Sequence, residues 1–161
     1  MKTIIAIDPG ASGGIAWRDK GGFTHCEKMP DTPAGILAAL KGIKYLFADN
    51  ACEAILEDVG KGRPGKPGKF QSSKSTASFA RHCGHIDMAL LALGIPRRLV
   101  TPQKWQKIVP QKLPTGDENK TARKKIIKQH AEARFPHLKV TLATSDALAM
   151  LDWALAKEAV L

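Results

Sequence analysis

Three acidic residues of this sequence lie at the ends of predicted strands or at the start of a predicted helix, positions where functional side chains are often found. Asp8 closes an apolar run near the N-terminus, Glu57 closes a second apolar run, and Asp146 falls in the first turn of a predicted helix. Carboxylate oxygens suit Mg²⁺ or Mn²⁺, and two such ions about 3.5 to 4 Å apart can activate water and stabilise the leaving oxygen in phosphodiester cleavage. Because clustered carboxylates repel one another, their convergence would favour a metal site.

Asp8 follows a predicted central strand. Residues 3–7 form a nearly continuous, mostly β-branched apolar run, which is typical of a strand buried on both faces. The next residues contain one proline and three glycines, which turn the chain and allow close backbone approach before a second strand begins at Ile15. Alternatively, Asp8 is a turn residue that hydrogen-bonds its own backbone.

The second acid ends another predicted strand, residues 54–59. If this strand is a parallel neighbour of the first, both acids lie at the edge of the sheet where open α/β folds place their ligand sites. Glu57 and Asp58 point to opposite faces, and we favour Glu57 as the inward residue. The alternative is that both acids only solvate a strand end.

The third acid begins the predicted helix 145–160, for which Thr144 or Ser145 is a plausible cap. By itself, Asp146 would be read as an acid that stabilises the helix dipole. The other predicted elements are, in order, a third antiparallel strand 23–29, helix 34–45, helix 75–93, strand 97–101, helix 102–109, basic helix 117–135, and a loop 136–144 with a possible short strand.

Helix 75–93 carries one apolar seam. Its members repeat at spacings of four, three, four and three residues, and they are Phe79, Cys83, Ile86, Leu90 and Leu93. Such a seam either packs in the core or forms a helix-to-helix contact in a dimer. Trp105, in the helix that follows the last strand, is interpreted as a packing residue.

The formal net charge of +10 favours a polyanionic partner, nucleic acid before membrane. The loop 60–74 is rich in glycine and proline, contains no acid, and is interpreted as an arm that contacts phosphates, or else as a solvated loop. Its basic residues are Lys61, Arg63, Lys66, Lys69 and Lys74. Phe70 either stacks on bases or packs on the next helix.

The basic helix 117–135 has the same two interpretations. Lys120, Arg123 and Lys124 lie near its start, and they belong either to a solvated face or to a surface that contacts the nucleic-acid backbone.

Length and composition predict one globular domain over residues 1–161. The three cysteines are widely spaced and indicate neither a disulfide framework nor a zinc site. No signal peptide and no stretch of membrane-spanning length is evident, which favours a cytoplasmic protein.

Several segments resemble the RuvC-type Holliday junction resolvases of the RNase H-like superfamily, in particular their compact phage and prophage branch. The matching pieces occur in the family's order along essentially the whole chain. They are IAIDPGASGGIA at 5–16, AILEDVG at 54–60, LVTPQKW at 99–105, ENK at 118–120 and SDALAML at 145–151.

The resemblance implies an α/β, RNase H-like fold, in which a mixed five-stranded sheet with antiparallel strands 1 to 3 is flanked by helices. It implies a homodimer in which each subunit cuts one strand of a four-way DNA junction. Asp8, Glu57 and Asp146 would hold Mg²⁺ or Mn²⁺, two ions per site, and Lys120 would approach the scissile region. Ser12 would contact DNA, and Phe70 would open the junction.

One position departs from the family pattern. Better-known members carry a fourth ligand three residues before the last acid, where this chain has Ala143. Asp152 lies on a different face of the helix and is not a substitute. A junction-binding protein without catalytic activity therefore stays open as an alternative. A second, independent alternative is a RuvC-like nuclease acting on RNA or on an RNA–DNA hybrid.

Overall fold

The computed structural model describes residues 3–46, 52–58 and 73–158. The strands are β1 (Thr3–Asp8), β2 (Gly14–Arg18), β3 (Thr24–Lys28), β4 (Cys52–Glu57) and β5 (Arg97–Val100). The helices are α1 (Pro33–Tyr45), α2 (Ser73–Ala92), α3 (Pro102–Trp105), α4 (Lys120–Arg134) and α5 (Ser145–Glu158), with a 3-10 turn at Gln106–Ile108. The sheet order is β3-β2-β1-β4-β5.

The sheet is mixed. β1 pairs antiparallel with β2, which pairs antiparallel with β3, whereas β4 runs parallel to both β1 and β5. This arrangement confirms the predicted five-stranded sheet with three antiparallel first strands. Every residue of β1 is buried, as its continuous apolar run predicted.

The register of β1 and β4 places two acids side by side. Ile7 is the partner of Leu56, so that Asp8 and Glu57 are the next residues of the two parallel strands. Side chains alternate between faces along a strand. Glu57 shares the face of Ile55, and Asp8 shares the face of Ala6. Asp58 is the residue after Glu57 and so does not share this alternation. Glu57 lies on the same face as Asp8, which confirms the prediction that Glu57 is the inward acid.

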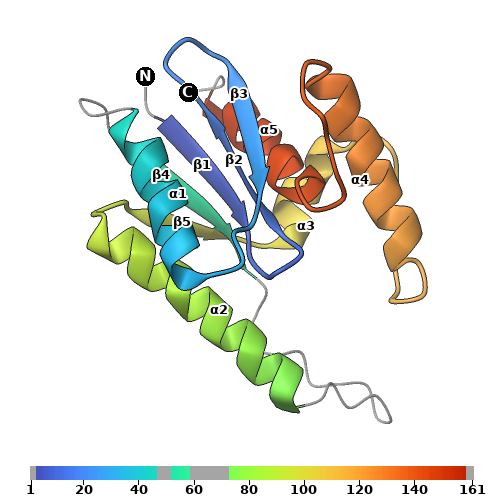
Figure 1. Ribbon diagram of the computed structural model, residues 1–161. Helices are drawn as coiled ribbons and strands as arrows, with labels where there is room; N and C mark the ends of the chain where they lie inside the picture. Colours follow the sequence, from blue (N-terminus) through green and yellow to red (C-terminus); the bar gives the residue numbers. More distant parts are fainter. Residues whose placement is uncertain (1–2, 47–51, 59–72, 159–161) are drawn as a thin grey trace.

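Helices cover both faces of the sheet (Figure 1). On one face, α1 and α2 pack over a core that includes Ile7, Leu56 and Leu90. On the other face, α3, α4 and α5 enclose a second core that includes Ile55 and Trp105. Asp8 and Glu57 belong to the second face, the one that α5 covers.

Several elements differ from the prediction at their boundaries. The helix predicted at 102–109 is α3 (Pro102–Trp105) followed by the 3-10 turn, and α2 begins at Ser73 rather than at residue 75. α4 begins at Lys120 rather than Asp117, because a tight turn comes first, in which the Lys120 N–H donates to the Asp117 carbonyl. Residues 136–144 form turns and irregular backbone, so the short strand considered for this segment is absent from it. The predicted α2 seam lies mainly inward: Ile86 is fully buried, and Phe79 is half-buried. No helix within the described ranges is long and apolar enough to cross a membrane.

Candidate active site

Asp8 is held at the end of β1 by a turn that requires glycine. The Gly13 N–H donates to the Gly10 carbonyl at 2.9 Å, which folds the turn back over the strand end. A Cβ atom on Gly13 would lie 2.0 Å from the Asp8 carbonyl oxygen, and Gly10 has a φ of +113°. Both positions therefore exclude larger residues. The predicted close backbone approach is confirmed, and at Gly13 the approaching backbone is that of Asp8.

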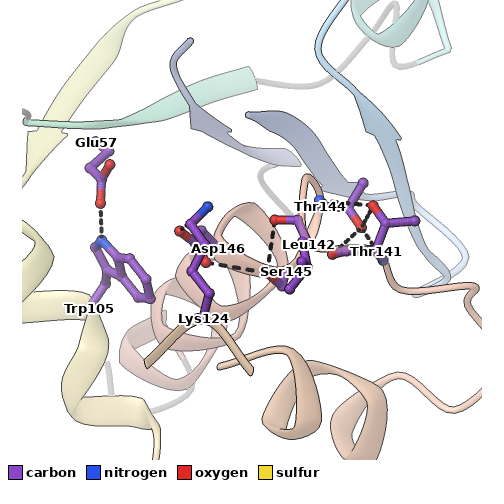
Figure 2. Close-up of polar contacts among 8 residues, drawn as sticks. All are labelled: Glu57, Trp105, Lys124, Thr141, Leu142, Thr144, Ser145 and Asp146. Atoms are coloured by element: carbon purple, nitrogen blue, oxygen red, sulfur yellow. Dashed lines mark hydrogen bonds and ion pairs between the residues drawn. The ribbon is translucent and has the colours of Figure 1, made fainter. Parts of the chain in front are cut away.

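Glu57 is oriented by a buried indole. Trp105 is fully buried, and its Nε1–H donates to Glu57 Oε1 at 3.0 Å (Figure 2). Trp105 reaches this position because β5 pairs with β4 and leads directly into α3. The interpretation of Trp105 as a packing residue is confirmed, but the sequence alone did not indicate its hydrogen bond to the acid.

Asp146 comes to the same edge of the sheet from the first turn of α5. Gly14 allows this approach, because a Cβ atom there would lie 2.7 Å from the Ala143 carbonyl oxygen. Before the helix, Thr141 and Thr144 hydrogen-bond each other's backbone N–H groups, at 3.0 and 3.3 Å. Ser145 Oγ lies 3.3 Å from Asp146 Oδ1 (Figure 2). These contacts fix the start of α5 and the carboxylate that it carries.

The three carboxylates interact with one another. Burial raises the pKa of Asp8 well above its usual range, and the negative charges of Asp146 and Glu57 raise it further. Burial and the charge of Asp146 also raise the pKa of Glu57, against the hydrogen bond from Trp105. The interaction between the Asp8 and Glu57 side chains raises the pKa of Asp8 further and lowers that of Glu57. The convergence predicted for the three acids is thus present in the structure.

Lys124 brings a positive charge to this cluster. Its Nζ lies 3.4 Å from Asp146 Oδ2, and its charge lowers the pKa of both Asp8 and Glu57 (Figure 2). From sequence, Lys124 is predicted to contact nucleic acid, and Lys120 is the lysine expected near the scissile region. Lys120 lies one helical turn earlier, is exposed, and is the first residue of α4.

The donor set has the chemistry of a site for a hard divalent cation. Three carboxylates, two of them with raised pKa, form an excess of negative charge that a cation would relieve. Within residues 3–46, 52–58 and 73–158, however, no group of three or more His, Cys, Asp or Glu side chains is arranged to hold a metal ion as it stands. The residues fit a metal in kind, and Asp8, Glu57 and Asp146 would have to draw closer around it.

Asp152, which the sequence analysis set aside as a ligand, is engaged elsewhere. It accepts hydrogen bonds from Arg134 at 2.9 to 3.1 Å and lies 3.0 Å from His130 Nε2. It therefore fastens the second half of α4 to α5.

The predicted nucleic-acid contacts fall into three groups. Ser12, Lys74 and Lys120 are exposed. Arg123 has an intramolecular role, since its Nη1 donates to the carbonyls of Pro114 and Gly116 at 3.1 and 3.3 Å. The remaining five residues lie outside the described ranges, and they are Lys61, Arg63, Lys66, Lys69 and Phe70.

This architecture is that of an RNase H-like α/β domain with an acidic edge between β1, β4 and α5. No family model matches the sequence, and no curated protein matches it either. Among solved structures, the chain is similar to T. thermophilus RuvC in complex with a Holliday junction substrate, with a TM-score of 0.63 and 12% identity over 99% of this chain and 96% of that one.

A second structure, described as that of Thermus thermophilus RuvC, gives a TM-score of 0.59 at 14% identity and covers 98% of this chain and 96% of the other. The likeness extends along nearly the whole of both chains. The resemblance to RuvC that the sequence motifs indicated is confirmed at the level of the fold.

Proposed function

We propose that this protein is a divalent-metal-dependent DNA endonuclease that resolves four-way junctions. The observation that carries the proposal is the convergence of Asp8, Glu57 and Asp146 at one edge of the sheet, in a chain with a net charge of +10. The acidic cluster suits a metal, whereas the basic surface suits the DNA backbone. The RuvC-like fold and the ordered motifs support the same activity.

Each residue of the cluster has a distinct role in this proposal. Mg²⁺ or Mn²⁺ held by the three carboxylates, two ions in all, would activate water and stabilise the leaving oxygen. Trp105 keeps the Glu57 carboxylate oriented toward the cluster. Burial of Asp8 limits the access of bulk water, which strengthens the electrostatic interactions within the site.

DNA reaches the site past the start of α2 in this proposal. The Phe79 ring lies 3.3 Å from the position of a Cβ atom on Gly10, so α2 begins close to the turn that follows Asp8. Lys74, on the first turn of α2, is exposed. We expect it to contact backbone phosphates together with the basic residues of the preceding loop.

A homodimer supplies the second nick. A four-way junction requires paired cuts, and two identical sites related by a two-fold axis provide them. The outer face of α2 is the surface that we assign to this contact. It has the 4-3-4-3 spacing of a packing seam, its residues are exposed, and they are Ala77, Arg81, Gly84, Met88 and Leu91. Leu91→Glu is expected to convert a dimer to a monomer in light scattering, whereas a monomeric wild type would exclude this assembly.

The test is a panel of end-labelled substrates with Mg²⁺ or Mn²⁺. Wild type is expected to nick a synthetic four-way junction more rapidly than linear duplex, RNA–DNA hybrid or structured RNA, and Glu57→Gln is expected to leave all of them intact. Faster cleavage of the hybrid or of the RNA would instead assign the protein to the RNA-directed nucleases.

The absence of a carboxylate at Ala143 favours one second candidate, a junction-binding protein that does not cleave. Tight, salt-dependent binding of the four-way junction without nicking in either metal would support this candidate.

A further inference from the structure

The acidic cluster already has a cation of its own in this chain. Three carboxylates lie together, and Lys124 is the basic residue whose charge opposes the raised pKa of both Asp8 and Glu57. Its Nζ forms an ion pair with Asp146 at 3.4 Å. That separation is longer than the 2.7 to 2.9 Å of a tight charge-assisted hydrogen bond, so the contact is electrostatic and open to exchange.

The packing of α4 holds Lys124 at this place. Ile127 and Ala131, on the same side of the helix, are buried against α5. Three residues after Ala131, at the end of α4, Arg134 binds Asp152 of α5 through three hydrogen bonds. With the helix fixed at its centre and its end, the Lys124 side chain is delivered to Asp146 and remains only about a quarter exposed, at 28%.

A divalent ion and this ammonium group compete for the same charge. An Mg²⁺ or Mn²⁺ ion bound to the Asp146 carboxylate would place two positive charges close to the Lys124 ammonium group. Like charges at such distances repel strongly in a partly buried site. By linkage, whatever favours the Lys124–Asp146 ion pair weakens metal binding to the same extent that metal binding weakens the ion pair.

We propose that Lys124 is an exchangeable counter-cation of the Asp8, Glu57 and Asp146 cluster, which sets the metal affinity of the site by competing for Asp146. The proposal rests on the proposed function, because it assumes that the cluster is where the metal binds. In this proposal, Lys124 sets the metal affinity of the site, a role that is separate from any contact with DNA.

Mn²⁺ binding, measured on the full chain without DNA from the electron paramagnetic resonance signal of free Mn²⁺, tests the proposal. Lys124→Met keeps the length of the side chain and removes the charge. Lys125→Met is the matched control, since Lys125 is the exposed neighbour on the same helix and loses the same charge. Lys124→Met is expected to bind Mn²⁺ about five- to thirtyfold more tightly than wild type. Lys125→Met is expected to change the affinity less than twofold, because exposed charges are screened.

Lys124→Gln also removes the charge and replaces Lys124→Met if that variant does not fold. Lys124→Arg retains the positive charge and is expected to stay within about threefold of wild type. Equal Mn²⁺ affinities for the Lys124→Met and Lys125→Met proteins, with binding still abolished by Asp146→Asn, would overturn the role of Lys124 and leave the proposed metal site intact. Unchanged Mn²⁺ binding in Asp146→Asn would instead remove the metal site, and the proposed function with it.

Discussion

The indole of Trp105 donates a 3.0 Å hydrogen bond to Glu57 from a fully buried position. An N–H donor at this distance stabilises the ionised form of the carboxylate and opposes the effect of burial on the pKa of Glu57. It also restricts the carboxylate to one orientation. The bond joins the end of β4 to α3, two segments about fifty residues apart, and sets the direction of one of the three acids.

Trp105→Phe is expected to impair the site more than the fold. The variant removes the donor and retains most of the apolar contact, so we expect a loss of about 1 to 3 kcal/mol in stability. The pKa of Glu57 should rise, so the pH at which half of the metal-dependent cleavage is lost should move upward. A pH series of single-turnover cleavage rates measures this shift.

Trp17→Phe is the matched control for this change. The Trp17 Nε1 atom is buried and has no hydrogen-bond partner among the residues that the structure describes, so its loss leaves no acceptor there unsatisfied. The variant should match wild type in both stability and pH profile. Equal effects of the two substitutions would show that the hydrogen bond to Glu57 has no special role.

Asp8→Asn is expected to stabilise the protein at neutral pH when divalent ions are absent. Because the pKa of Asp8 is higher in the folded state than in the unfolded state, the folded state binds more protons, and the stability of wild type falls as pH rises from about 4 through the raised pKa. Asn removes this loss, by about 1 kcal/mol, or about 2 to 4 °C in melting temperature. The difference should vanish below about pH 3.5, where the carboxyl group is protonated in both states.

Thermal melts at several pH values, with Asp31→Asn as a control, measure this effect. Asp31 carries an exposed carboxylate, 82% accessible, that pairs with Lys28, and its loss should change stability by less than about 0.5 kcal/mol at any pH. A destabilised Asp8→Asn protein at pH 7.5 would show that the carboxylates do not repel one another as described.

Gly13→Ala is expected to disrupt the turn after β1. Because the added Cβ would lie 2.0 Å from the Asp8 carbonyl oxygen, the backbone must shift, at a cost of about 3 kcal/mol or more. Gly42→Ala, in α1, provides the contrast. Outside the nearby backbone of α1, no atom of the described residues lies within 4 Å of the added Cβ, and helix propensity predicts a gain of about 0.5 to 1 kcal/mol. Urea denaturation of the two variants measures both changes, and a tolerated Gly13→Ala would refute the turn geometry.

Asp152→Asn is expected to loosen α4 from α5. The buried carboxylate receives three hydrogen bonds from Arg134, and because that arginine is 59% exposed it can be rehydrated, so we expect a loss of about 2 kcal/mol. Glu132→Gln breaks the surface ion pair with Lys128 on the same helix and should cost at most about 0.5 kcal/mol. Hydrogen exchange of the α4 amides should accelerate in the first variant only. Equal exchange rates in the two variants would argue against a structural role for Asp152.

The sheet and the acids could be predicted from sequence because their signals are local. Continuous β-branched runs mark β1 and β4, and the parity of Glu57 against Asp58 follows once the two strands are parallel. The late start of α4 could not be predicted, since the acids before it resembled an N-terminal signal while the chain closed a tight turn at Asp117 instead.

The contacts of Lys124 and Trp105 could not be predicted either. The first depends on how α4 lies against α5, and the second depends on the pairing of β4 with β5. Neither the packing of α4 on α5 nor the pairing of β4 with β5 produces a periodic or compositional pattern around Lys124 or Trp105 in the sequence. A lysine in a basic helix has the same sequence signature whether it faces solvent or an acidic cluster.

The most direct measurement is single-turnover nicking of a labelled four-way junction by wild type, Asp8→Asn and Asp58→Asn in Mn²⁺ and in EDTA. Asp58 directly follows Glu57 but is not among the charges that shift the pKa of Asp8 or Glu57, which makes it the matched carboxylate control. We expect wild type and Asp58→Asn to nick the junction in Mn²⁺ but not in EDTA. Asp8→Asn should lose at least a thousandfold in rate, the scale expected when a metal-activated step is removed. Equal nicking by wild type and Asp8→Asn, or nicking in EDTA, would contradict it.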